Sequence, residues 1–487
     1  MNDVGIDFGT TNSCAAAYVP GVAEPVFVPP VNPLPSIVLY SGEEIVVGNI
    51  ARKRWVEGSG SSGQTGVPSV KRLMWGKYLD VHLHSGDNVS VTDVAARILS
   101  EIHTQYRKAL GADIGEAVIA VPIGFRAEQR KLLREAATKA GIGVKTFIHE
   151  PFAAVLPIIA EKPDGHYLVF DWGGGTLDIT MVAKDGNIFG EVAVGSLNDV
   201  AGDEFDRIVA YKVARRFFNE LAMTAGLEAL SAPMRERLRI QCEAAKRDLS
   251  DRDETTVTIP LFFKGRPLLQ KITRASLEDW IDKELEKGIV ELLATFERSG
   301  VEAASIRELI MVGGTSKIPL LKKKAEALMP CKVTLPPRSE FLIAQGAAWA
   351  SKMAAGLVLA ADLQLRIPSP KASVESALIT ILKRGDRVGY GGVRVEREFY
   401  CTDWSNRELR LALCLDGQTH RVLKWQIPED AILRLVKDGG YPRPKRFPLK
   451  IFFEIDENLA LKIAPRLPGL SLEPCFLQDL RFAVKLN

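Results

Sequence analysis

The sequence is poor in cysteine, with six in 487 residues, and no two of them form a CxxC pair. This spacing gives no support to a zinc ribbon, a thioredoxin-like motif or a disulfide scaffold. Charges nearly balance, 63 Lys and Arg against 60 Asp and Glu, so neither nucleic acid nor a membrane surface is an expected partner. No apolar run of about 18 residues is present, and Asp3 and Asp7 interrupt the N-terminal segment where a signal peptide needs one. We therefore expect a soluble protein of the cytoplasm.

Two common phosphate-binding motifs are also missing. No GxxxxGK[ST] occurs, and no GxGxxG follows an apolar strand, so neither a P-loop nor a Rossmann fold is expected. The Gly- and Ser-rich stretch 58–63 is typical of a surface loop. The 25% charged and 46% hydrophobic residues are ordinary for globular proteins, and the length suggests two or three domains.

The first two-thirds of the chain alternate short apolar runs with amphipathic helical runs. The sequence predicts a strand at 118–121 and helices at 126–140 and 205–217, the second with apolar residues every four positions. Thr92 with Asp93 is predicted to cap a helix whose inner face is Val94, Ile98, Ile102 and Tyr106. Pro319 is predicted to begin a helix that reaches Leu328. Strands that alternate with helices indicate an α/β architecture.

After about Leu365 the pattern changes to strict alternation, which predicts strands. Asp416-Gly417 and Gly439-Gly440 supply turn residues between the alternating runs. The apolar positions fall in four sets: Leu409, Leu411, Leu413 and Leu415; Ile451, Phe453 and Ile455; Leu459, Leu461 and Ile463; and Phe482, Val484 and Leu486. This pattern predicts a separate all-β domain, a sandwich.

One element of the first region is repeated. Residues 4–11, VGIDFGTT, are echoed by residues 168–176, LVFDWGGGT. Each copy has an apolar strand, an Asp, a bulky residue, a glycine turn and a Thr. The repeat predicts two similar halves that face each other.

The repeated turns suit phosphate chemistry. Glycines after a strand let backbone N–H groups converge on phosphate oxygens. Asp7 and Asp171 open the two turns, and Mg²⁺ with its waters would offset the repulsion between their carboxylates. The hydroxyls of Thr10, Thr11 and Thr176 lie in the same turns. Either turn alone could be a tight hairpin without a ligand, but the pair favours a phosphate clamp.

A third glycine turn occurs at residues 311–319, MVGGTSKIP. It combines a strand, two glycines and a helix that begins with proline. Close backbone approach and a helix N-terminus suit a nucleoside or an anion. Taken alone, the element could equally be a plain strand-to-helix turn.

Together these motifs resemble the ATPase domain of the Hsp70 chaperones, within the actin-like superfamily. The similar segments occur in the family's order: 5–13 (GIDFGTTNS), 68–73 (PSVKRL), 120–122 (AVP), 150–151 (EP), 169–180 (VFDWGGGTLDIT), 243–250 (EAAKRDLS) and 310–321 (IMVGGTSKIPLL). The resemblance is dense over residues 1–355. It implies an α/β actin-like ATPase domain, two similar halves around a nucleotide cleft, followed by the all-β sandwich.

The resemblance also implies roles for individual residues. Lys71 would contact the γ-phosphate and the attacking water, and Glu150 and Thr176 would help to position water. Asp7, Asp171 and Asp178 would surround Mg²⁺, held through waters, and K⁺. ATP or ADP would be held by Gly9, Thr10, Thr11, Asn12, Gly173, Gly174, Gly175, Gly202, Glu243, Lys246, Arg247, Ser250, Gly313, Gly314, Lys317 and Glu340. In this arrangement Glu243, Lys246, Arg247 and Ser250 would contact the adenosine on one side, and Gly314 and Lys317 would contact it on the other. Taken alone, the spacing of those four residues would indicate only a solvated helix face.

The predicted domains are 1–356 for the ATPase, 357–367 for an apolar linker and 368–487 for the β-sandwich. Residues 439–444, 451–456 and 459–461 resemble the last strands of the family's peptide-binding domain, so extended or unfolded polypeptides are the implied partners. No helical lid follows in the sequence, and we therefore expect weak, fast peptide trapping. The basic residues Arg443, Lys445, Arg446 and Lys450 are interpreted as a solvated face.

Four positions depart from the family pattern. Thr146 and His149 replace the Arg and Asn that contact J-domain proteins, so a J-domain partner is less strongly implied than a nucleotide. Asn12 replaces a frequent Tyr, and Lys317 replaces a frequent Arg. A nucleotide-exchange factor is the family's other usual partner.

Three functions follow from the sequence. The first is an ATP-hydrolysing chaperone whose nucleotide state is coupled to peptide binding. The second is a small-molecule kinase on the same scaffold, which would need a base aimed at a substrate hydroxyl. The third is a nucleotide-bound scaffold or co-chaperone with little peptide trapping. The acidic positions and Lys71 favour a hydrolase.

Overall fold

The computed structural model describes residues 2–22, 24–58, 63–76, 79–197, 200–367, 377–388, 393–401, 407–430, 447–478 and 480–486. The predicted turn at Gly439-Gly440, the resemblance at 439–444 and the basic residues Arg443, Lys445 and Arg446 lie outside these ranges. The chain divides into two compact units. Unit 1 comprises residues 1–123, 132–186 and 192–353, and unit 2 comprises 124–131, 187–191 and 354–487. Among the described helices, none is long and apolar enough to span a bilayer.

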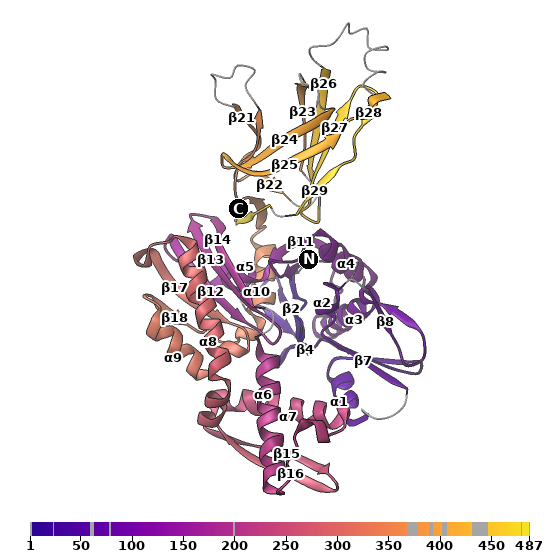
Figure 1. The fold of residues 1–487 in the computed structure, drawn as a ribbon, viewed down its shortest axis with the longest axis vertical. Coiled ribbons are helices and arrows are strands. Elements are labelled where there is room, and N and C mark those ends of the chain that lie inside the picture. Colours follow the sequence, from indigo (N-terminus) through magenta and orange to yellow (C-terminus); the bar gives the residue numbers. More distant parts are fainter. Residues whose placement is uncertain are drawn as a thin grey trace. The chain divides into compact units, whose positions relative to one another are not determined.

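Unit 1 is built on two sheets with the same plan (Figure 1). In the first sheet the order is β11-β10-β1-β2-β3, and the first five strands of the eight-stranded second sheet have the order β18-β17-β12-β13-β14. In each, the first strand of the half pairs antiparallel with the next strand and parallel with a later one. The strands are β1 (Asp3–Asp7), β2 (Asn12–Tyr18), β3 (Val26–Val28), β10 (Glu116–Val121), β11 (Gly143–His149), β12 (Gly165–Trp172), β13 (Leu177–Asp185), β14 (Ile188–Leu197), β17 (Ile306–Val312) and β18 (Lys332–Thr334). The repeated sequence motif therefore corresponds to a repeated topology, and we call the parts of unit 1 built on these sheets the first half and the second half.

Helices cover these sheets, and most are where the sequence places them. The helices are α1 (Gly48–Gly58), α2 (Val70–Leu73), α3 (Val91–Leu110), α4 (Ala127–Lys139), α5 (Glu150–Ile159), α6 (Gly202–Glu220), α7 (Ala232–Asp251), α8 (Arg274–Ser299), α9 (Pro319–Leu328) and α10 (Leu342–Lys352). All four predicted inner residues of α3 are buried. The predicted cap is wrong by two positions, because Ser90 is the N-cap residue and its Oγ accepts the Asp93 N–H. Asp93 instead accepts a hydrogen bond from Ser90 Oγ through its carboxylate (2.6 Å).

Smaller elements complete unit 1. Strand β4 (Leu34–Pro35) pairs with β2, and β5 (Ile37–Ser41) pairs with β6 (Glu44–Val47) and β7 (Gln64–Pro68). Strands β8 (Asp80–His82) and β9 (Asn88–Ser90) form a hairpin before α3. Strands β15 (Glu254–Phe263) and β16 (Arg266–Thr273) form another, which contacts α7. Helices α1 and α7 contact each other.

Helix α10 packs unusually close to its neighbours in the first half. A Cβ atom on Gly346 would lie 1.5 Å from the backbone oxygen of Ala153 in α5, and one on Gly5 would lie 2.0 Å from the Ala348 backbone nitrogen. Only residues without a side chain allow β1, α5 and α10 to approach in this way.

We therefore expect Gly346→Ala to lower the free energy of unfolding by about 3 kcal/mol, because helices α5 and α10 must separate to admit the methyl group. Urea denaturation of the full chain measures this change. Gly115→Ala is the matched control, since a Cβ at Gly115 would have no atom within 4 Å. Equal stability of the two variants would contradict the packing described here.

Unit 2 contains two antiparallel sheets, and one face of each is buried. The four-stranded sheet has the order β21-β20-β24-β25, and the other has β23-β26-β27-β28 with β29 paired to β27. The strands are β20 (Leu363–Ile367), β21 (Ala377–Leu382), β23 (Val393–Cys401), β24 (Glu408–Leu415), β25 (Gln418–Gln426), β26 (Phe447–Ile455), β27 (Leu461–Leu467), β28 (Leu470–Ser471) and β29 (Cys475–Leu477). Trp425 Nε1 donates to the Glu473 carbonyl (2.7 Å), which ties β25 to the segment between β28 and β29. The described part of this unit is β-rich, as the alternating pattern predicts.

Three details of unit 2 differ from the sequence prediction. Leu459 precedes β27 with a left-handed backbone (φ 61°) rather than lying on the strand. Leu363–Ile367, predicted as linker, forms β20 of the four-stranded sheet. Strand β30 (Phe482–Lys485) joins neither sandwich sheet and pairs with β19 (Gly356–Leu359) and with Ile188–Gly190 of β14, while β22 (Arg387–Val388) pairs with β19. An alternating pattern identifies the buried face of a strand, but it does not identify the strand's partner.

Candidate functional site

The two aspartates of the repeat occupy equivalent places in the two sheets. Asp7 is the last residue of β1 and lies opposite Cys14 in β2, and Asp171 lies near the end of β12, opposite Asp178 in β13. Directly opposed residues of an antiparallel pair share one face of the sheet, so Asp171 and Asp178 are neighbours. Thr176 Oγ1 donates to Asp178 Oδ2 (3.0 Å) and orients that carboxylate.

Lys71 and Glu150 form a buried ion pair between α2 and the first residue of α5. Only 4% of Lys71 and 8% of Glu150 is exposed. A buried charge needs a partner, and breaking such a pair is costly because the remaining charge stays buried. The two residues that the resemblance assigns to the reacting phosphate and water are thus held together.

The three aspartates share one electrostatic environment with this pair. Burial, followed by the negative charge of Glu150, raises the pKa of Asp7 to about 7, and Lys71 partly opposes the shift. Burial and Glu150 likewise raise the pKa of Asp178 to about 6. The pKa of Asp171 is raised well above its ordinary value by burial and then by Glu150, Asp178 and Asp7. The structure therefore gathers the five predicted acidic and basic residues into one cluster with an excess of carboxyl groups.

The glycine turns lie against each other. A Cβ on Gly174 would lie 2.5 Å from Thr11 Oγ1, and one on Gly175 would lie 3.0 Å from Thr10 Cγ2. The second turn closes on itself through the Gly173 N–H and the Thr176 carbonyl (3.0 Å). The first turn is held by serines, because Ser36 Oγ donates to the Gly9 carbonyl (2.9 Å).

The start of α6 and the third turn complete this arrangement. The N–H groups of Gly202 and Asp203 donate to the carbonyls of Gly173 and Gly174 (3.1 and 2.8 Å). Gly313 has φ +84°, and a Cβ there would lie 2.7 Å from Asp171 Oδ1, so glycine is required for the third turn to approach the second. Thr315 Oγ1 donates to the Gly173 carbonyl (2.8 Å). The third turn thus lies directly against the second.

The predicted adenosine residues lie on α7, and two of them make contacts that join elements. Lys246 Nζ donates to the Gly202 carbonyl (2.8 Å) and pairs with buried Asp206 (2.7 Å). Glu243 pairs with Arg52 of α1 and with Arg247 (2.5 Å). Burial alone would raise the pKa of Glu243, but Arg52, Arg247 and Lys246 together lower it. The Arg52–Glu243 pair connects the first half to the second.

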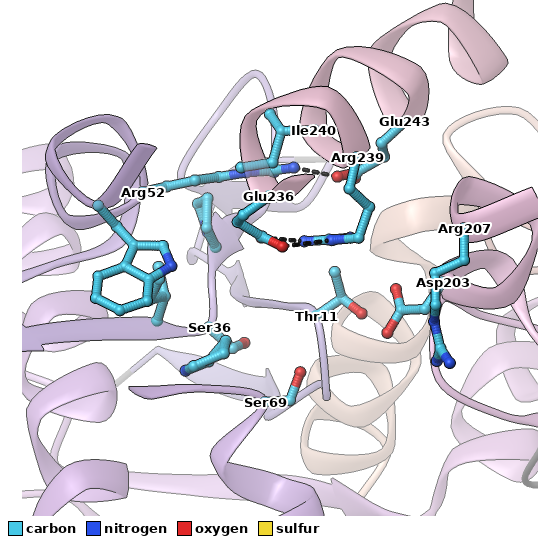
Figure 2. Close-up of a pocket in the computed structure, with 14 residues that line it drawn as sticks. Thr11, Ser36, Arg52, Ser69, Asp203, Arg207, Glu236, Arg239, Ile240 and Glu243 are labelled. Atoms are coloured by element: carbon cyan, nitrogen blue, oxygen red, sulfur yellow. Dashed lines mark hydrogen bonds and ion pairs between the residues drawn. The ribbon is translucent and has the colours of Figure 1, made fainter. Parts of the chain in front are cut away.

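A cavity of about 380 Å³ lies between these elements (Figure 2). Its walls come from α1 and the segment around Ser36 on one side and from the helices α6 and α7 on the other. Figure 2 shows Thr11 and Asp203 near one another, with the ion pairs Arg52–Glu243 and Arg239–Glu236 in the wall. Small-molecule sites have volumes of this order. Of the predicted nucleotide-binding residues, Thr11 and Glu243 line this cavity and the others do not.

Other predicted residues lie apart from the cavity. Lys317 forms an ion pair with Glu340 (2.7 Å), and Asn12 begins β2 opposite Pro35 of β4. Ser250 lies near the end of α7, and Gly314 precedes the short turn that leads into α9. Thr146 is in β11, and the ring of His149 stacks on Phe152.

A family model described as Hsp70 protein matches residues 3–370. The chain belongs to the Hsp70 family. The match spans most of the sequence, including every residue proposed above for nucleotide or metal binding. Members of this family are ATPases, and the sequence resemblance to it is confirmed.

This Hsp70-family chain has several site residues that sequence reasoning missed. Arg52 and Asp206 make the ion pairs described above, and Asp203 Oδ2 lies 3.6 Å from Arg72 Nη2. Ser13 and Ser36 bond to each other (2.8 Å) beside the first turn. Arg72 directly follows Lys71 in the segment PSVKRL, so its place beside a predicted catalytic residue could have identified it from the sequence. Arg52 lies in none of the segments that resemble the family, so the sequence offered no comparable indication.

The residues present suit Mg²⁺ carried by a nucleotide. Buried carboxylates are oxygen donors of the kind that Mg²⁺ prefers. Thr11 Oγ1 is buried without a hydrogen-bond partner and lies at the contact of the two turns. Among the residues that the structure describes, no three His, Cys, Asp or Glu side chains converge as a direct metal site. The donor set therefore fits an ion held partly by phosphate oxygens and water, with Asp7, Asp171 and Asp178 around it.

Proposed function

We propose that this chain binds MgATP between the two glycine turns and hydrolyses it to ADP and phosphate, and that nucleotide state controls the binding of extended polypeptide by the β-rich unit. One observation carries the proposal: the turns that follow Asp7 and Asp171 lie in contact, beside the buried Lys71–Glu150 pair. Phosphoryl transfer to water depends on positioning and charge stabilisation, which this cluster supplies.

In this proposal each group has a distinct task. Backbone N–H groups of the glycine turns bind phosphate oxygens, and Lys71 stabilises the negative charge of the transferred phosphoryl group. Glu150 and Thr176 orient the attacking water. Bound Mg²⁺ supplies positive charge to the phosphates. The face of α7 that carries Glu243, Lys246, Arg247 and Ser250 holds the adenosine, with Gly314 and Lys317 opposite. Asp7, Asp171 and Asp178 would hold K⁺ as well as Mg²⁺.

Peptide binding is proposed from family membership, because the family binds unfolded polypeptides. J-domain proteins and exchange factors are the corresponding accessory partners. The test is to measure ATP hydrolysis with and without a panel of unfolded peptides, and peptide affinity with MgATP and with MgADP. We expect peptide affinity to differ about 5- to 150-fold between the two nucleotides, the usual range of allosteric coupling. Equal affinities would remove the coupling, and hydrolysis stimulated by a sugar but not by peptides would instead favour a small-molecule kinase.

The raised pKa values of the aspartates predict a pH dependence. Without a bound cation, Asp7 and Asp178 keep protons in the folded chain up to about pH 7 and 6, whereas in the unfolded chain they lose them near 3.8. These groups therefore contribute stability at low pH that is lost as pH rises from about 4 through 7. A cation offsets this loss because it favours the charged carboxylates. We expect saturating MgADP to raise the Tm more at pH 8 than at pH 6, relative to ADP with EDTA, as thermal denaturation would show. The same increment at both pH values would contradict this electrostatic account.

A further inference from the structure

Arg72 is adjacent to Lys71 on the short helix α2, yet its contacts lie in the other half of unit 1. Lys71 pairs with Glu150 in the first half. Arg72 Nη2 donates to the carbonyl of Gly175 in the second turn (2.9 Å). The same nitrogen lies 3.6 Å from Asp203 Oδ2 at the start of α6. The neighbouring side chains of Lys71 and Arg72 thus make their contacts on opposite sides of the proposed phosphate site.

Three elements meet at Gly175. A Cβ atom on this residue would lie 2.9 Å from Arg72 Nη2 and 3.0 Å from Thr10 Cγ2 of the first turn. The preceding carbonyl, that of Gly174, already accepts the Asp203 N–H (2.8 Å). The start of α6 therefore fixes one carbonyl of the second turn from within its own half, and Arg72 fixes the next carbonyl from the other half.

The position of Arg72 separates its role from that of Lys71. Its side chain is 42% exposed, whereas Lys71 lies inside the carboxylate cluster. A hydrogen bond from a guanidinium to a backbone carbonyl is charge-assisted and stronger than a neutral one. It restrains the backbone of the second turn at Gly175.

We infer that Arg72 is a positioning residue that holds the second glycine turn against the first, and that it sets nucleotide affinity rather than the rate of the chemical step. The inference rests on the proposed ATP binding. In this inference the hydrogen bond from Arg72 to the Gly175 carbonyl links the two halves. Lys71 remains the residue whose positive charge acts in the chemical step.

The test compares Arg72→Ala, Arg72→Lys and Arg54→Ala in the full chain. Arg54 is the matched control, since it is 46% exposed and its ion pair with Glu44 stays within the first half (2.7 Å). MgADP and a non-hydrolysable MgATP analogue are titrated by calorimetry, and kcat and KM are measured separately. Hydrogen exchange of the peptide that contains Gly173–Gly175 is followed without nucleotide.

Arg72→Ala is expected to raise Kd for both nucleotides and KM by about tenfold, the effect of losing one charge-assisted hydrogen bond, with kcat within about threefold of the unchanged chain. Exchange in the Gly173–Gly175 peptide should be faster in this variant. Arg72→Lys should recover part of the affinity because it keeps a cationic donor. Arg54→Ala should match the unchanged chain in every measurement.

Two results would overturn the inference. If Arg72→Ala matches Arg54→Ala in both affinity and exchange, the Gly175 contact has no role. If kcat falls while Kd is unchanged, Arg72 acts in the chemical step and not in positioning. A chain that binds nucleotide with the predicted Arg72 effect but does not hydrolyse ATP would refute the proposed hydrolysis and support the role of Arg72, and a chain that binds no nucleotide would refute both.

Discussion

Replacing Lys71 with alanine is expected to reduce ATP hydrolysis at least about 100-fold while MgATP remains bound. Lys71 is the cation of the carboxylate cluster that faces the two turns, and its loss removes about 3 kcal/mol or more of charge stabilisation from the transition state. Single-turnover hydrolysis and equilibrium binding of a non-hydrolysable analogue separate the two effects. Thr176→Ala should lower hydrolysis in the same direction, because Thr176 orients Asp178.

A second variant distinguishes this chemistry from loss of the fold. Lys71→Ala leaves Glu150 buried without its partner, which should cost about 3–5 kcal/mol of stability. The double variant Lys71→Met with Glu150→Gln removes both charges and should recover much of that stability while hydrolysis stays low. Near-normal hydrolysis by the folded double variant would show that the pair is structural and not catalytic.

The second large effect is expected from Gly174→Val. The Cβ atom alone would lie 2.5 Å from Thr11 Oγ1 and 3.3 Å from Asp203 Oδ1, and the two methyl groups of valine would add bulk at the contact of the turns. We expect the affinity for both MgATP and MgADP to fall about 100-fold, because the turns can no longer close on the phosphates. Calorimetric titration measures the change.

Gly115→Ala again serves as the control for Gly174→Val, since it adds a methyl group where there is open space. Circular dichroism and thermal denaturation should show that the Gly174→Val chain is folded. If the folded variant binds nucleotide as tightly as Gly115→Ala, the contact between the turns is not the binding site.

Local patterns in the sequence predicted much of this architecture. The apolar spacing of α3 and α6 gave buried faces because a helix repeats every 3.6 residues, and the repeated Asp–Gly motif corresponded to repeated sheets. The cap of α3 was misplaced because Ser90, Thr92 and Asp93 are all residues that favour N-caps. Strand β30 was assigned to the wrong sheet because its pattern does not encode its partners.

The site depends on contacts between residues far apart in sequence, which explains what was missed. Arg72 bonds to Gly175 across 103 positions and Arg52 pairs with Glu243 across 191. Nothing in the sequence identifies the partner of either arginine, because only the fold brings the two ends of each contact together. The family resemblance implied roles for Lys71 and Glu150, but it did not imply these cross-links between the halves.

A structure of the full chain with Mg²⁺ and a non-hydrolysable ATP analogue tests the central claim most directly. The account predicts the triphosphate between residues 9–11 and 173–175, with Lys71 at the terminal phosphate and the adenosine along the face of α7. A nucleotide bound elsewhere, or turns too far apart to contact the same phosphates, would contradict it.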